Sequence, residues 1–201
     1  RPAEIKFDRG FLTFTYDSST GNVTRIVSPS NDTLRFTYDG PLPLSANWNG
    51  SLNGTVAVRY DNEFRVIQQK VNDEDSVGFA YDQDGLLRRA GDLKIKRDPN
   101  NGLFLGDTLG NFVTNVGYNN LGEMVSYEAK HGSTPLFATT CERDPVGRIT
   151  VLNETTQGVT TEHRYGYDLA GQLEQVWRND TLQATYFYDA NGNRDSVVTP
   201  N

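Results

Sequence analysis

Cysteine is nearly absent from this chain of 201 residues: Cys141 is the single one, so no disulfide can form within the chain. Histidine is almost as rare, and neither His131 nor His163 has further potential ligands at the spacing of a metal site. No apolar run approaches the roughly 18 residues that a membrane-spanning helix needs. We therefore predict no metal, no other cofactor and no insertion of this segment into a membrane.

Positive charge is in the minority. The chain has 19 Lys and Arg against 26 Asp and Glu, which gives a formal net charge of -7, and no cluster of basic residues is evident. Because nucleic-acid binding depends on clustered Lys and Arg, we predict no nucleic-acid partner. Hydrophobic residues make up only 36% of the chain, which favours a thin sheet with one modestly apolar face over a thick core.

What the chain has in abundance is a recurring Tyr-Asp dipeptide. Six of the ten tyrosines are followed directly by aspartate, whereas chance pairing predicts fewer than one such pair. The aspartates of the first four pairs are separated by 22, 22 and 21 residues, and those of the last two by 21 residues. A fixed period of this size indicates one supersecondary unit used repeatedly. The six pairs are Tyr16-Asp17, Tyr38-Asp39, Tyr60-Asp61, Tyr81-Asp82, Tyr167-Asp168 and Tyr188-Asp189.

Degenerate copies fill the gap between Asp82 and Asp168: Arg97-Asp98, Tyr118-Asn119 and Arg143-Asp144. We therefore expect residues 1–201 to form a single array of about nine hairpin repeats without a linker. Most repeats also carry a glycine three or four positions after the acid. The predicted structural residues of the repeat are Tyr16, Asp17, Gly21, Tyr38, Asp39, Tyr60, Asp61, Tyr81, Asp82, Gly85, Asp98, Gly102, Tyr118, Asn119, Gly122, Asp144, Gly147, Tyr167, Asp168, Gly171, Tyr188, Asp189 and Gly192.

The spacing of acid and glycine is that of a turn. Asp or Asn can accept a hydrogen bond from the backbone two residues on, and glycine reaches the positive φ that reverses the chain. Aromatic residues two positions apart, such as Phe14 and Tyr16, precede the turn and lie on one face of a strand. The predicted fold class is all-β, with repeated antiparallel β-hairpins forming an elongated, twisted and curved sheet whose aromatic rings line up across strands.

Two local questions stay open at the level of sequence. Apolar residues after each turn are offset by three, as in Val23 and Ile26 or Leu173 and Val176. Either a bulge turns the second residue to the face of the first, or both faces of the sheet are partly covered. The stretch from Gly40 to Gly54 contains two prolines and two Asn-Gly pairs, and we expect it to make a longer connection.

The repeats resemble YD repeats, also called Rhs (rearrangement hotspot) repeats, whose pattern is close to aromatic-x-Tyr-Asp-x-x-Gly-Arg/Leu-Leu. The resemblance runs from Phe14 to Arg194, nearly the whole chain. Segments similar to bacterial members in particular include YDNEFRV at 60–66, YDQDGLL at 81–87 and YDANGNR at 188–194.

The resemblance implies an architecture and partners. In related bacterial toxins YD repeats form a hollow β-shell around a C-terminal toxic polypeptide, and in teneurins a similar shell belongs to a cell-adhesion receptor. The chain is then expected to be a structural segment of a larger bacterial protein that is secreted or on the cell surface. Its expected partners are the remainder of the shell and an enclosed toxin or cargo, and open sheet edges also favour self-association.

One alternative function is a recognition module for cell-surface glycans or proteins, with Trp48 as a stacking platform. An enzyme is not predicted, because turn formation accounts for the repeated aspartates and function requires a converging site. The cluster Asp73, Glu74 and Asp75 lacks the spacing of a calcium loop and indicates a solvated hairpin tip.

Overall fold

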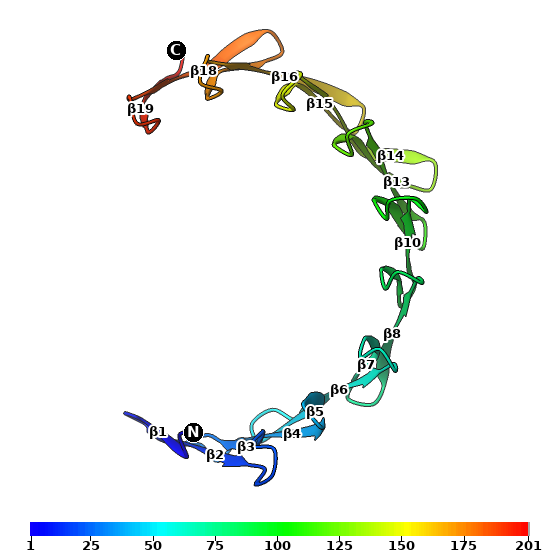
Figure 1. Cartoon of the computed structure of the whole chain (residues 1–201), viewed down its shortest axis with the longest axis vertical. Coiled ribbons are helices and arrows are strands. Elements are labelled where there is room, and N and C mark those ends of the chain that lie inside the picture. Colours follow the sequence, from blue (N-terminus) through cyan, green and yellow to red (C-terminus); the bar gives the residue numbers. More distant parts are fainter. Residues whose placement is uncertain (201) are drawn as a thin grey trace. The chain divides into compact units, whose positions relative to one another are not determined.

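The computed structural model describes residues 1–200, and among these it contains strands and turns but no helix. All 19 strands pair antiparallel with a neighbour in sequence (Figure 1). The chain divides into two compact halves, Arg1–Gly91 and Asp92–Asn201, which are described separately. The predicted all-β class built from antiparallel hairpins is confirmed.

The N-terminal half is a meander in which each strand pairs with the next. Its strands are β1 (Glu4–Phe7), β2 (Gly10–Tyr16), β3 (Val23–Val27), β4 (Thr33–Asp39), β5 (Leu42–Asn49), β6 (Gly54–Tyr60), β7 (Val66–Val71), β8 (Asp75–Tyr81) and β9 (Leu87–Ala90).

The C-terminal half repeats the same order of pairing with longer strands. They are β10 (Leu93–Arg97), β11 (Phe104–Leu109), β12 (Phe112–Tyr118), β13 (Met124–His131), β14 (Thr134–Arg143), β15 (Ile149–Thr156), β16 (Val159–Tyr167), β17 (Leu173–Arg178), β18 (Thr181–Tyr188) and β19 (Arg194–Val198).

Two kinds of turn alternate along each half. The turns that begin with the repeated acid follow the even-numbered strands, β2 to β8 and β10 to β18. In each half they therefore lie at the same ends of the strands. Most turns at the opposite strand ends are shorter, such as Asn72-Asp73 with φ of 51° and 58° and Asn179-Asp180 with φ of 46° and 64°. Two successive positive φ values match the right-handed twist of the flanking strands, as in a type I′ hairpin.

Neither half has a thick core. Among residues 1–200 no large side chain is fully buried, and Ala184, with 8% of its surface exposed, is the one buried hydrophobic residue. The strand register in the N-terminal half nevertheless separates two faces. One row across β2 to β5 is apolar, and the adjacent row on the other face is polar. The apolar row is Phe14, Ile26, Leu34 and Trp48, and the polar row is Thr15, Arg25, Arg35 and Asn47.

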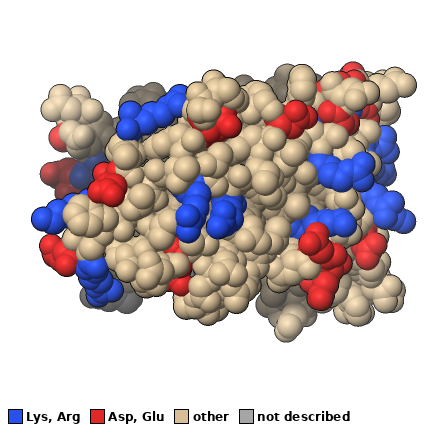
Figure 2. Space-filling model, turned by 90° about the horizontal axis from the view of Figure 1, so that it is seen from below, with Lys and Arg blue, Asp and Glu red and all other residues tan. Residues whose placement is uncertain are grey.

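On the face shown in Figure 2, residues of both charges lie among uncharged ones. Several form local pairs along a strand or turn, such as Lys130 with Glu128 at 2.8 Å and Arg164 with Glu162 at 3.1 Å. The face in view shows no broad basic surface, which agrees with the net charge of -7.

A β-bulge precedes the tyrosine position in all nine repeats and answers the first open question. In the first repeat Val23 lies opposite Tyr16 and Arg25 lies opposite Thr15, so Thr24 is the extra residue. Ile26 therefore lies opposite Phe14, on the face of Val23. The other bulges lie at Thr37/Tyr38, Arg59/Tyr60, Ala80/Tyr81, Lys96/Arg97, Gly117/Tyr118, Glu142/Arg143, Gly166/Tyr167 and Phe187/Tyr188.

The expected long connection between Gly40 and Gly54 is wrong. Leu42–Asn49 is strand β5, which pairs with β4 and β6. Its prolines are tolerated for two reasons. Pro41 lies in the tight turn before the strand, and Pro43 lies opposite Tyr38 at the bulge, where the regular ladder of N–H donors is interrupted.

Candidate functional site: the turn and joint of the repeat

The turn of the fourth repeat shows how its acid and glycine act. The backbone N–H of Asp82 donates to the carbonyl of Leu86 at 3.0 Å. One carboxylate oxygen of Asp82 accepts from the N–H groups of Asp84 and Leu86 at 3.1 and 2.9 Å. The N–H of Gly85 donates to the carbonyl of Asp82 at 3.1 Å, and Gly85 has a φ of 78°. The acid thus closes the turn, and glycine supplies its left-handed residue.

Seven further repeats use the same arrangement. Their acid or amide accepts backbone N–H groups two to four residues on. These residues are Asp17, Asp61, Asp98, Asn119, Asp144, Asp168 and Asp189. The glycines with positive φ in these turns are Gly21, Gly102, Gly122, Gly147, Gly171 and Gly192.

Two repeats, those of Asp39 and Asp61, lack a glycine three or four positions after the acid. Asp39 is the last residue of β4 and pairs with Leu42, so its hairpin turns on Gly40 and Pro41 alone. In the third repeat Phe64 occupies the glycine position with a φ of 62°, and its N–H donates to the carbonyl of Asp61 at 3.1 Å. The backbone conformation of that turn is therefore kept even where the residue disfavours it.

Hydrogen bonds inside the turns stabilise the charged form of the acids. The hydroxyl of Ser19 and then the N–H and hydroxyl of Thr20 hold the pKa of Asp17 well below its usual range. The side-chain amide and then the N–H of Asn193 lower the pKa of Asp189 in the same way. Carboxylates that stay ionised and point into their own turn are suited to holding the backbone, and not to donating a proton to a substrate.

The tyrosine of a repeat binds the repeat before it, which the sequence did not predict. The hydroxyl of Tyr38 donates to the carbonyl of Val23 at 2.8 Å, and Val23 lies opposite Tyr16 at the preceding bulge. The same relation recurs at 2.7 to 2.9 Å in both halves. These bonds are Tyr60 to Pro43, Tyr81 to Val66, Tyr118 to Phe104, Tyr167 to Ile149 and Tyr188 to Leu173.

The aromatic rings contact one another along a strand. The ring centroids of Phe14 and Tyr16 are 6.4 Å apart, and those of Phe36 and Tyr38 are 6.5 Å apart. Rings also meet across strands, since the ring centroids of Tyr127 in β13 and Phe137 in β14 are 6.1 Å apart. Successive repeats are further linked by the tyrosine hydroxyl and by the residue that follows the glycine position of the turn, which we name the joint residue.

Two joint residues are arginines that contact both their own turn and the next tyrosine. The Nε of Arg148 lies 2.7 Å from the Asp144 carboxylate, and its Cζ lies 4.5 Å from the centroid of the Tyr167 ring. Arg65 repeats this with Asp61 at 2.8 Å and Tyr81 at 4.9 Å. Each guanidinium thus makes an ion pair within its repeat and a cation–π contact with the next.

Two other joint residues are amides that reach the backbone of the next turn. The side chain of Gln172 donates to the carbonyl of Gly192 at 3.2 Å, and that of Asn22 donates to the carbonyl of Gly40 at 3.0 Å. A Cβ at Gly192 would lie 3.1 Å from the Gln172 amide nitrogen. The turn glycine therefore also leaves room for the joint residue of the preceding repeat.

Both tryptophans cover glycines of a neighbouring strand. A Cβ on Gly54 would lie 2.4 Å from the Trp48 ring, and one on Gly166 would lie 3.2 Å from the Trp177 ring. This placement favours a packing role for Trp48 over a free platform for a sugar ring.

The remaining candidates for chemistry do not converge. Cys141 donates through Sγ to the carbonyl of Met124 at 3.2 Å. His131 lies against Phe112, with ring centroids 4.6 Å apart, and His163 lies in β16 opposite Leu152. Among the described residues no group of three or more His, Cys, Asp or Glu side chains could hold a metal ion, and no helix there could cross a membrane.

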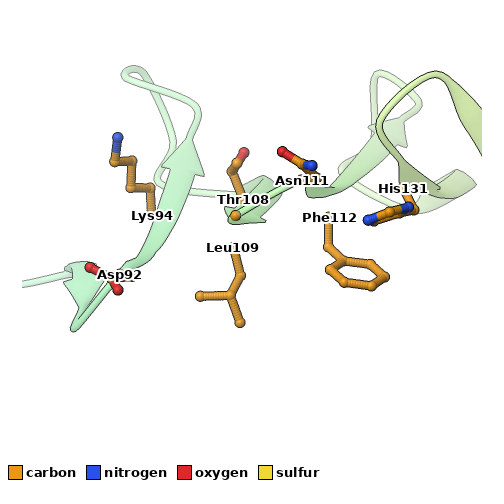
Figure 3. A pocket seen from close by; sticks show the side chains of 8 residues that line it. Asp92, Lys94, Thr108, Leu109, Asn111, Phe112 and His131 are labelled. Carbon is orange, nitrogen blue, oxygen red and sulfur yellow. The ribbon is translucent and has the colours of Figure 1, made fainter.

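A shallow open pocket lies beside the turn between β11 and β12 (Figure 3). Leu109 and Phe112 point to one side of the ribbon, whereas Lys94 and Thr108 point to the other. Its polar and apolar groups therefore do not face a common point, as a catalytic site would require.

Comparison with known proteins agrees with the repeat geometry. A family model described as Teneurin YD-shell matches residues 1–200. Mouse (Mus musculus) teneurin-3 is 28% identical over 209 residues, which cover 96% of this chain and 8% of teneurin-3. Chicken (Gallus gallus) teneurin-1 is 29% identical over 208 residues, with coverage of 96% and 8%. The chain thus spans about 8% of the length of these curated relatives.

Two solved structures share the fold. The crystal structure of TcdB2-TccC3-TEV superposes with a TM-score of 0.60 at 14% identity, covering 98% of this chain and 15% of that one. The Photorhabdus luminescens Tc holotoxin pore gives 0.58 at 13% identity, covering 97% and 13%. With the family model matching residues 1–200, this chain is a structural segment that belongs to the Teneurin YD-shell family.

Proposed function

We propose that the chain is a wall segment of a larger hollow shell, in a secreted or cell-surface protein, and that this shell encloses a toxin or other cargo polypeptide. The observation that carries the proposal is the hydrogen bond from the tyrosine of one repeat to the bulge carbonyl of the repeat before it, as in Tyr167 to Ile149 at 2.8 Å. A link of this kind fixes each hairpin against its predecessor, which suits a wall built by repetition.

The exposure of the sheets supports the same role. Neither half buries a large side chain fully among its described residues, although one face of β2 to β5 in the N-terminal half carries a row of apolar and aromatic side chains. Such a face is suited to contact with further polypeptide, in the form of the remaining shell or its contents. As part of this proposal, all nine repeats act as one array in the parent protein. The exposed strands β1 and β19 are then where an isolated segment would self-associate.

The proposal assigns no catalytic, cofactor or metal-binding role to the repeat. Its carboxylates accept N–H groups of their own turns, and its tyrosine hydroxyls donate to backbone carbonyls. These groups are therefore engaged in holding the sheet.

The proposal can be tested in the full-length parent protein by deleting one repeat, residues 145–168, which joins Asp144 directly to Leu169 and keeps a turn sequence in place. We expect the enclosed polypeptide to become sensitive to an added protease, while any activity of the released cargo stays unchanged. The matched control is Leu169→Ser, which alters a fully exposed turn side chain and should leave protection intact. Equal protection of the cargo in the deletion variant and the control would refute the shell role.

A further inference from the structure

The joint between the sixth and seventh repeats has a different chemistry from the arginine joints. At the arginine joints an acid begins the turn, arginine follows the glycine position, and tyrosine stands at the Tyr-Asp position of the next repeat, as in Asp144, Arg148 and Tyr167. At the sixth joint the corresponding residues are Asn119, Glu123 and Arg143. All three positions are changed together, so the substitutions that make these repeats degenerate lie at one place in the structure.

These three residues contact one another in the same order. The side-chain amide of Asn119 donates to Glu123 Oε2 at 2.7 Å, where an aspartate would repel the glutamate. Glu123 Oε2 lies 4.0 Å from Arg143 Nε, at the limit of an ion pair. A Cβ on Gly147 would lie 2.6 Å from Glu123 Oε1, so the glutamate occupies the joint position against the next turn glycine.

The guanidinium of Arg143 also takes over the hydrogen bond of the missing tyrosine. Its Nη2 donates to the carbonyl of Met124 at 3.2 Å, and Met124 lies opposite Tyr118 at the preceding bulge. Its Nη1 donates to the carbonyl of Gly147 at 2.7 Å, within its own turn. The positive charge has thus moved from the joint residue to the position of the next tyrosine, and the negative charge has moved to the joint.

We propose that the joint residue and the first residue of the next Tyr-Asp position form a matched pair that determines which repeat can follow which. Arginine at the joint matches tyrosine in the next repeat, and glutamate at the joint matches arginine. The residue that begins the turn also matches the joint residue: an acid pairs with arginine, and an amide donates to glutamate. Three positions thus form one interaction unit. This inference concerns the contact between repeats and holds independently of any enclosed cargo.

The test transplants one joint chemistry into the other within the whole chain. Asn119→Asp, Glu123→Arg and Arg143→Tyr are made singly and together, and thermal unfolding is followed by circular dichroism. Glu123→Arg alone faces Arg143 with a like charge, and Arg143→Tyr alone leaves Glu123 without its cationic partner. We expect each of these two to lower the Tm by about 2–4 °C, the shift that a change of ~1 kcal/mol produces in a chain of this size. The triple variant should melt above both.

The reciprocal transplant is Asp144→Asn, Arg148→Glu and Tyr167→Arg at the seventh joint. Glu174→Arg, at an exposed residue of β17, makes the same change of charge as Glu123→Arg and is its matched control. Losses that simply add in either triple variant would overturn the matched pair, as would a triple variant that fails to fold when its single variants fold. A single variant that fails to fold while the triple variant folds supports it. Hydrogen exchange at the amides of Gly147 and Gly171 reports the same outcome at each joint.

Discussion

The hydroxyl of Tyr188 lies 2.7 Å from the backbone carbonyl oxygen of Leu173, the residue that faces Tyr167 across the bulge of the preceding repeat. This bond joins the ninth repeat to the eighth, and equivalent bonds join most other neighbours within each half. The tyrosine of the repeat therefore contributes through its hydroxyl as well as through its ring. The carbonyl that accepts this bond belongs to Leu173, which lies at a bulge where the regular ladder of backbone hydrogen bonds is interrupted.

The first prediction concerns that hydroxyl. Tyr188→Phe keeps the ring but leaves the carbonyl of Leu173 without this donor, so we expect a loss of about 0.5–1.5 kcal/mol in the free energy of unfolding. Tyr186→Phe is the control, because the hydroxyl of Tyr186 has no hydrogen-bond partner among residues 1–200 and its ring faces Arg194. In urea denaturation, Tyr188→Phe should have a lower free energy of unfolding than Tyr186→Phe. The reverse order would contradict the role of the hydroxyl.

The second prediction separates two reasons for glycine. Gly171 has a φ of 84°, whereas Gly166 lies in strand β16 under the ring of Trp177. Gly171→Ala forces a side chain into the left-handed region at a cost of about 1–3 kcal/mol. Gly166→Ala requires a shift of a few tenths of an ångström in Trp177 and should cost less. In thermal melts Gly171→Ala should therefore have the lower Tm of the two variants. An equal loss of Tm in both would count against the importance of positive φ at the turn.

The third prediction is a stabilising change. Phe64 holds a φ of 62° at the glycine position of the third repeat, and 70% of its surface is exposed. Phe64→Gly relieves about 1–2 kcal/mol of left-handed strain, while the freer unfolded chain costs about 0.5–1 kcal/mol. Phe64→Ala removes the same ring and keeps the strain. We expect the glycine variant to have the higher Tm of the two. A higher Tm for the alanine variant would show that the strain is absent.

The positions of the turns could be predicted from the sequence, because their determinants are local. An acid and a glycine within four residues set the hairpin, and the period places the next one. The bulge was signalled only by the offset of three between Val23 and Ile26, which a regular strand also produces when both faces are covered. Strand β5 was missed because Pro43 is compatible with a strand only at an irregularity that the sequence does not show.

The contacts between repeats could not be predicted from spacing alone. Tyr188 and Leu173 are 15 residues apart, and their contact depends on the register of three strands and on the bulge. The exchange at Asn119, Glu123 and Arg143 did leave a signal, since two degenerate residues occur in adjacent repeats with a glutamate between them. That signal could be interpreted only once the structure showed that these three side chains meet at one joint.

The last prediction is the dependence of stability on acid. Hydrogen bonds from Ser19 and Thr20 lower the pKa of Asp17, and those from Asn193 lower the pKa of Asp189. Because the folded-state pKa lies below the value of about 3.9 in the unfolded chain, the unfolded state binds the proton more readily. The stabilisation is therefore fully present above the unfolded pKa and is lost as the pH falls through the folded pKa. Melting curves between about pH 7 and pH 2 should show a falling Tm at the acid end.

Asp17→Asn keeps a side-chain oxygen in the turn but cannot titrate, so its Tm should fall less steeply with acid than that of the unsubstituted chain. Identical slopes would exclude Asp17 as a source of the acid sensitivity.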